Sequence, residues 1–164
     1  METAVALNKL CKKHRIPFIV NDSVELCLKA DADGVHLGQE DGSLTEARKI
    51  LGPSKIIGAT AHNLEEALRA ESEGADYIGV GAAFGSKTKM VSGAIDLNEY
   101  NRITQQVHIP VVAIGGIHAG NIDALYDRGI SGVSVISAIF GDSHTSPEKI
   151  RDNALVLRRL AEHL

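Results

Sequence analysis

Short apolar runs alternate with helix-like segments along the whole chain of 164 residues, and this alternation constrains the fold more than any other feature. Runs such as 111–114 are apolar throughout, which is typical of strands that are covered on both faces. Strict alternation of strands and helices predicts a parallel sheet in an α/β domain. Six strands are predicted, and they begin near residues 17, 34, 56, 77, 111 and 132.

Capping residues mark the ends of several predicted helices. Ser43 and Glu46 form a capping box, and Ser146 precedes a proline at the first helical position. The chain contains neither a linker nor a low-complexity segment, so we expect one domain over residues 1–164. The predicted helices cover residues 3–14, 23–30, 43–52, 63–74, 97–107, 121–129 and 146–164.

Two α/β architectures are compatible with this pattern. A (βα)8 barrel needs eight strands and typically about 250 residues, whereas an open doubly wound sheet accommodates six strands. A weak internal repeat indicates a series of strand-helix units, because related segments begin at Ala32, Ala75 and Ile130. The pattern alone does not choose between the two architectures.

Composition excludes several functional classes. The net charge is -4 without a basic stripe, which argues against a nucleic-acid surface. No apolar run approaches the roughly 20 residues of a membrane span, and the signal-peptide pattern is absent, so we expect no membrane partner and a cytoplasmic location. Cys11 and Cys27 lack metal-ligand spacing, and we expect both to be reduced thiols.

Acidic residues follow two neighbouring predicted strands at the point where each strand ends. Asn21 and Asp22 come after the apolar run at 18–20, and Asp41 comes shortly after the run that ends at Leu37. Ligands of parallel α/β proteins bind at the carboxyl ends of the strands. Two carboxylates that converge there are suited to hold Mg2+ against a phosphorylated substrate. Taken alone, each aspartate has the ordinary interpretation of a helix cap or a turn residue.

Two glycine-containing loops have the composition of phosphate sites. The loop at 81–89 combines glycines, hydroxyl groups and lysines, which offer backbone N–H groups, side-chain donors and positive charge to an anion. Gly115 and Gly116 precede Asn121, which we expect to cap a helix whose N-terminus is a second phosphate site. A lone histidine such as His36 is more often a core residue than a catalyst. The predicted site therefore depends on all of these residues meeting at one edge.

Six segments of the chain carry a resemblance to a known family. They are Ile16-Pro-Phe-Ile-Val-Asn-Asp22, Ala32-Asp-Gly-Val-His-Leu-Gly-Gln-Glu-Asp41, Asp76-Tyr-Ile-Gly-Val-Gly81, Ser86-Lys-Thr-Lys89, Ala113-Ile-Gly-Gly-Ile117 and Gly132-Val-Ser-Val-Ile-Ser137. The chain resembles thiamine phosphate synthases, which are (βα)8 barrels of the TIM type. The resemblance implies a transferase of thiamine biosynthesis that joins hydroxymethylpyrimidine diphosphate to thiazole phosphate and releases pyrophosphate.

The resemblance also implies roles for individual residues. Mg2+ is expected on Asp22 and Asp41, and His36 is expected to line the pyrimidine pocket. His36 and Lys89 are the expected catalytic residues. The pyrimidine diphosphate is expected to contact Asn21, Thr60 and Lys89. The thiazole phosphate is expected to contact Ser86, Lys87, Thr88, Gly116, Ile136 and Ser137.

The chain departs from the family pattern at its beginning. Family members start with a strand, a helix and a second strand that carries a Q-x-R-x-K-like motif, and this chain starts in the following helix. Ser23 stands where an arginine is usual. We therefore expect a barrel without its first strand-helix-strand unit, and an activity that this truncation impairs. The alternatives are a thiazole tautomerase of the same fold and a non-catalytic phosphate-binding remnant.

An incomplete barrel leaves two strand edges without a neighbour. The edges are expected at 18–20 and 132–135. Exposed strand edges pair readily with another chain. We therefore expect a homo-oligomer formed through these edges, and small phosphorylated molecules as the other partners.

Overall fold

The computed structural model describes residues 1–85 and 93–164. Within these residues, six strands form one parallel sheet in which every strand neighbours the next along the chain. The observed strands begin within about two residues of the predicted positions. The strands are β1 (Ile19–Asn21), β2 (Gly34–Leu37), β3 (Ile56–Ala61), β4 (Tyr77–Gly81), β5 (Val111–Ile114) and β6 (Gly132–Ser134).

Most helices begin at the capping residue that the sequence predicts. The hydroxyl oxygen of Ser23 accepts a hydrogen bond from the Leu26 backbone, and Asn63 does the same for Glu66. The helices are α1 (Glu2–Lys13), α2 (Val24–Lys29), α3 (Leu44–Leu51), α4 (Leu64–Ser72), α5 (Asn98–Thr104), the 3-10 helix η1 (Ile122–Leu125), α6 (Ser137–Phe140) and α7 (Pro147–Ala161). Among the helices in the described ranges, none combines the length and apolar character that a membrane crossing needs.

The prediction of a capped helix over 121–129 is wrong. The chain forms only the four-residue η1 there, and the Asn121 side chain makes no cap hydrogen bond. Instead, Asn121 donates from Nδ2 to the carbonyl of Gly116 and accepts at Oδ1 from the backbone N–H of His118. These contacts hold the turn before η1 and occupy the side chain that a cap would use.

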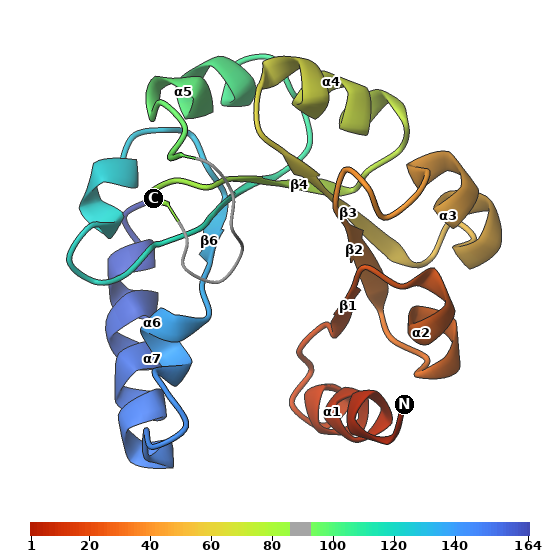
Figure 1. Ribbon diagram of the computed structural model, residues 1–164, viewed down its shortest axis with the longest axis horizontal. Helices are drawn as coiled ribbons and strands as arrows, with labels where there is room; N and C mark the ends of the chain where they lie inside the picture. Colours follow the sequence, from red (N-terminus) through yellow and green to blue (C-terminus); the bar gives the residue numbers. More distant parts are fainter. Residues whose placement is uncertain (86–92) are drawn as a thin grey trace.

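The strand order distinguishes the two candidate architectures. The sheet curls, and α2, α3, α4 and α5 lie along its convex side (Figure 1). A doubly wound sheet reverses its strand order and carries helices on both faces. The observed arrangement has neither property, so the barrel-type fold is confirmed and the open doubly wound alternative is wrong. Among the described residues, β1 pairs only with β2 and β6 pairs only with β5.

The two faces of the sheet differ in burial. Alternate strand residues such as Val35, Ile57 and Ile78 are fully buried in the core. This core lies between the sheet and the helices of its convex side (Figure 1). The strand neighbours of these residues, among them His36 and Tyr77, lie on the concave side and are only half-buried. Because side chains alternate between the faces of a strand, the apolar core and the polar concave face come from the same strands.

The internal repeat has a structural cause at the amino-terminal edge of the sheet. The carboxylate of Asp33 accepts from the backbone N–H of Phe18 at 2.8 Å, and the carboxylate of Asp76 accepts from that of Ile57 at 2.7 Å. The backbone N–H of each aspartate donates in return to the carbonyl of the same residue. Each repeated aspartate thus fixes the start of one strand against the next.

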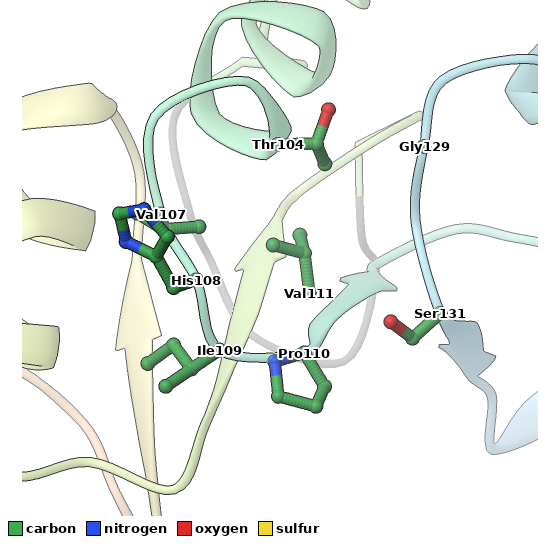
Figure 2. Close-up of a pocket in the computed structure, with 8 residues that line it drawn as sticks. All are labelled: Thr104, Val107, His108, Ile109, Pro110, Val111, Gly129 and Ser131. Carbon is green, nitrogen blue, oxygen red and sulfur yellow. The ribbon is translucent and has the colours of Figure 1, made fainter.

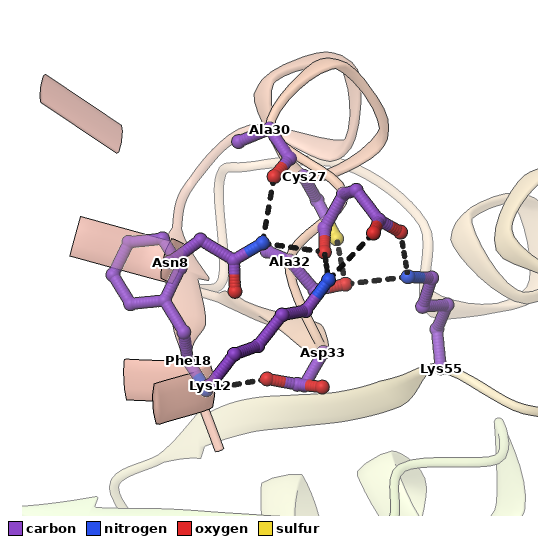
Figure 3. Close-up of polar contacts among 9 residues, drawn as sticks. Asn8, Lys12, Phe18, Cys27, Ala30, Ala32, Asp33 and Lys55 are labelled. Atoms are coloured by element: carbon purple, nitrogen blue, oxygen red, sulfur yellow. Dashed lines mark hydrogen bonds and ion pairs between the residues drawn. The ribbon is translucent and has the colours of Figure 1, made fainter. Parts of the chain in front are cut away.

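Polar contacts attach α1 to the segment between α2 and β2 (Figure 3). Asn8 is 4% exposed and donates from Nδ2 to the carbonyls of Ala30 and Asp31, both at 2.8 Å. The Asp31 carboxylate accepts from Lys12 at 2.6 Å and from Lys55 at 3.1 Å. The hydrogen bonds from the two lysines, that from Lys12 first, lower the pKa of Asp31.

Candidate active site

Strand register gathers the predicted polar residues at the carboxyl edge of the sheet. Asn21 of β1 lies opposite His36 of β2, and Thr60 of β3 lies opposite Gly79 of β4. Gly81 at the end of β4 lies opposite Ile114 of β5. In barrel enzymes, this edge is the one that carries the active site.

A four-residue turn holds Asp41 in place after β2. The backbone N–H of Gly38 donates to Asp41 Oδ2 at 2.7 Å, and the backbone N–H of Asp41 donates to the carbonyl of Gly38 at 3.2 Å. A methyl group on Gly38 would lie 2.7 Å from the same Oδ2, so a larger residue at this position would displace the Asp41 carboxylate. The carboxylate is exposed, and Oδ1 makes no hydrogen bond with any described residue.

Asp22 directly follows β1. Its φ angle is 66°, a left-handed conformation that aspartate tolerates better than most residues. Its backbone N–H donates to the carbonyl of His36 at 2.8 Å, which ties the turn to β2. The Asp22 carboxylate is exposed and makes no hydrogen bond or ion pair within residues 1–85 and 93–164.

The two carboxylates offer oxygen atoms of the kind that Mg2+ prefers. Over the described part of the chain, no group of three or more His, Cys, Asp or Glu side chains is placed to hold a metal by itself. Mg2+ is usually held by one or two carboxylates, with substrate phosphates and water completing its shell. The donor set of Asp22 and Asp41 therefore fits this ion only together with a phosphorylated ligand.

His36 connects three strands across the concave face. Its Nδ1 lies 3.0 Å from the hydroxyl oxygen of Tyr77, and its Nε2 lies 3.0 Å from Thr60 Oγ1. Burial raises the pKa of Tyr77. The structure thus brings the predicted residues His36 and Thr60 together. It adds Tyr77, which is not part of the site predicted from the sequence. The sequence feature that could have indicated Tyr77 is the pair of strand glycines Gly58 and Gly79, because they leave room for the rings of His36 and Tyr77.

The two glycine loops pack against each other at the ends of β4 and β5. Ala83 donates from its backbone N–H to the carbonyl of Ile114 at 2.8 Å, and Phe84 donates to that of Gly115 at 3.1 Å. Gly116 has a φ angle of 68°, and a methyl group there would overlap the carbonyl oxygen of Gly85. The predicted residues Ser86, Lys87, Thr88 and Lys89 lie outside the described residues.

The remaining predicted residues follow β6. Ile136 is 62% exposed, and the exposed Ser137 is the first residue of α6. Gly116 is also exposed, but η1 after it is too short to supply the helix-terminal phosphate site that the sequence predicts. Any phosphate binding at Gly116 therefore depends on the loop itself.

The structure also contains a cavity that lies away from the carboxyl edge of the sheet. The cavity has a volume of about 250 Å³. It lies between the end of α5 and the segments that lead into β5 and β6 (Figure 2). Thr104, Val111 and Ser131 are among its lining residues. Val111 begins β5 and Ser131 precedes β6, so this cavity lies at the amino-terminal edge, away from Asp22 and Asp41.

Comparisons with known proteins agree with this geometry. A family model described as thiamine monophosphate synthase matches residues 1–139. Thiamine-phosphate synthase of Clostridium acetobutylicum is 46% identical over 156 residues, which are 95% of this chain and 72% of the relative. The structure of thiamine phosphate pyrophosphorylase from Pyrococcus furiosus is 38% identical, with a TM-score of 0.86 over 98% of this chain and 75% of that one. The chain therefore belongs to the thiamine monophosphate synthase family.

Proposed function

We propose that this chain, as one domain, is a thiamine phosphate synthase that acts in the cytoplasm. It would condense hydroxymethylpyrimidine diphosphate with thiazole phosphate to give thiamine phosphate and pyrophosphate. The observation that carries the proposal is the pair of exposed carboxylates, Asp22 and Asp41, at the ends of adjacent strands. A thiazole tautomerase of the same fold handles no diphosphate and has no need of this pair.

We assign Asp22 and Asp41 to Mg2+. When bound, the ion would neutralise charge on the diphosphate, which makes pyrophosphate a better leaving group. The turn after β2 prepares one of the two carboxylates for this role, because the Gly38 N–H holds Asp41 Oδ2 while Oδ1 makes no hydrogen bond with any described residue. An oxygen ligand that is already oriented loses less conformational freedom on binding.

The other residues position the two substrates. In the reaction the carbon–oxygen bond between the pyrimidine methylene and the diphosphate breaks, and the thiazole nitrogen forms the new bond to that carbon. Asn21, Thr60 and Lys89 would hold the diphosphate, and His36 would line the pyrimidine pocket. Such a reaction needs orientation and charge stabilisation rather than a covalent nucleophile. The thiazole phosphate would be held by Ser86, Lys87, Thr88, Gly116, Ile136 and Ser137.

The variant Asp41→Asn tests the proposal. We expect Mg2+ with pyrophosphate to raise the melting temperature of the parent, because a ligand that binds only the native state stabilises it. The shift should vanish in Asp41→Asn and persist in Glu40→Gln, which removes the adjacent exposed acid. Turnover of the two substrates to thiamine phosphate should follow the same order. A parent that neither shifts nor turns over, or an Asp41→Asn variant that shifts like the parent, contradicts the proposal.

We also propose that the chain forms homo-oligomers through β1 and β6. The support is that each of these strands has one paired side among the described residues. Sedimentation equilibrium over a range of protein concentrations measures the association directly. A monomer at every concentration contradicts this part of the proposal.

A further inference from the structure

Tyr77, His36 and Thr60 form a hydrogen-bonded row across β4, β2 and β3. Gly58 lies between the two rings, since it pairs with His36 on one side and with Tyr77 on the other. A methyl group on Gly58 would lie 2.5 Å from His36 Nδ1 and would overlap the Tyr77 ring. One on Gly79 would lie 3.2 Å from His36 Cε1. The strands thus leave a space that the two rings fill.

The chemistry of the three groups favours one direction for the hydrogen bonds. A neutral imidazole carries one donor and one acceptor nitrogen, so the partner of Nδ1 decides the role of Nε2. A phenol hydroxyl is a stronger donor than an aliphatic hydroxyl, and burial of Tyr77 raises its pKa, which keeps the proton on the oxygen at neutral pH. Tyr77 therefore donates to Nδ1, and Nε2–H donates to Thr60 Oγ1.

This direction determines what Thr60 can do for a ligand. When Oγ1 accepts from His36, the hydroxyl hydrogen of Thr60 points to a different acceptor, and no such acceptor is found among the described residues. In the opposite direction Thr60 would donate to Nε2 and would have no hydrogen left for an anionic oxygen. The tautomer of His36 therefore decides whether Thr60 is a donor toward the carboxyl edge.

We propose that Tyr77 is a positioning residue that sets the Nε2–H tautomer of His36 and thereby presents the Thr60 hydroxyl as a donor to a phosphate oxygen of the substrate. The inference rests on the proposed function for the identity of the ligand. The tautomer of His36 is a property of the protein without ligand, so that part of the inference does not depend on the proposed function. The two parts are therefore tested by separate measurements.

The first measurement is a long-range ¹H–¹⁵N spectrum of the histidines at about pH 8, where imidazoles of ordinary pKa are neutral. The His36 signals are assigned by their loss in His36→Gln. We expect the Nε2–H tautomer in the parent and its loss in Tyr77→Phe. The control is Tyr126→Phe, which alters a tyrosine that packs against a different ring, that of His163. An Nδ1–H tautomer in the parent, or an unchanged one in a folded Tyr77→Phe variant, overturns the proposal.

The second measurement is calorimetric binding of pyrophosphate in the presence of Mg2+. We expect Tyr77→Phe to weaken binding by about tenfold, the lower end for a hydrogen bond to a charged group. The same substitution in a Thr60→Val background should have no further effect, because the two residues act as one unit. Independent, additive losses contradict the positioning role. If the parent binds no pyrophosphate, the proposed function fails, while the spectrum still decides the tautomer.

Discussion

The substitution Gly58→Ala tests the packing of the concave face directly. The added methyl group would overlap the Tyr77 ring and lie 2.5 Å from His36 Nδ1. Overpacking a site of this kind costs about 1–3 kcal/mol, and displacing the histidine from its hydrogen bond with Tyr77 adds about 1 kcal/mol. Replacing glycine by alanine restricts the unfolded chain and returns about 0.4–1 kcal/mol. We therefore expect the free energy of unfolding to fall by about 2 kcal/mol.

Gly132→Ala is the matched control for this substitution. Gly132 is also a strand glycine of the same sheet, its φ angle is not left-handed, and an added methyl group would meet nothing within 4 Å. We expect its stability to equal or slightly exceed that of the parent.

Thermal unfolding followed by far-UV circular dichroism separates the two variants. A loss of 2 kcal/mol corresponds to a melting temperature about 4–8 °C lower for a chain of this size. We therefore expect Gly58→Ala to melt that far below the parent, with Gly132→Ala at or above it. Equal melting temperatures for the two variants would refute the reasoning, because they would show that the rings do not occupy the space beside Gly58.

Two further predictions concern stability. Tyr100 is fully buried and donates to the carbonyl of Val80 at 2.8 Å, so Tyr100→Phe removes a buried hydrogen bond and should lower the free energy of unfolding by about 1 kcal/mol in urea titrations; an unchanged midpoint contradicts this. The lowered pKa of Asp31 means that its ion pairs stabilise the fold above the ordinary aspartate pKa of about 3.9 and cease to do so as the pH falls through the lowered value. The difference in melting temperature between the parent and Asp31→Asn should accordingly be constant between about pH 5 and 7 and shrink as the pH falls below the ordinary aspartate pKa of about 3.9. A difference that does not shrink in acid would exclude the charge as its cause.

Strands were predictable because their outward-facing residues must be apolar. The predicted strands at 34–37 and 111–114 match β2 and β5, since these short runs carry buried residues on the side that the helices cover. The helix α6 was not predicted, because its four residues are too few to show a helical period. The helix predicted over 121–129 failed because Asn121, which has the residue type of a cap, bonds backward to Gly116.

The candidate site was predictable only in part. Asp22, Asp41 and His36 could be placed because they lie at or beyond the end of a recognisable strand. Tyr77 could not, because it begins β4 and has the appearance of a core residue until the register sets it opposite Gly58. The order of the strands in the sheet could not be predicted from the sequence pattern either, because barrels and doubly wound sheets share the same local alternation of strand and helix. The family resemblance, which reflects the whole chain, supplied that choice.

The same residue type has opposite roles at the two edges of the sheet. At the amino-terminal edge, the carboxylates of Asp33 and Asp76 accept hydrogen bonds from the backbone of a neighbouring strand, so their charge is used within the fold. At the carboxyl edge, the Asp22 carboxylate and one oxygen of Asp41 have no such partner among the described residues. The Asp22 carboxylate and the second oxygen of Asp41 can therefore bind a cation without giving up a hydrogen bond of the fold, and an asparagine at position 41 can still accept from the Gly38 N–H. Neutralising Asp33 or Asp76 should therefore lower the free energy of unfolding. Neutralising Asp22 or Asp41 should instead impair ligand binding and leave the fold intact.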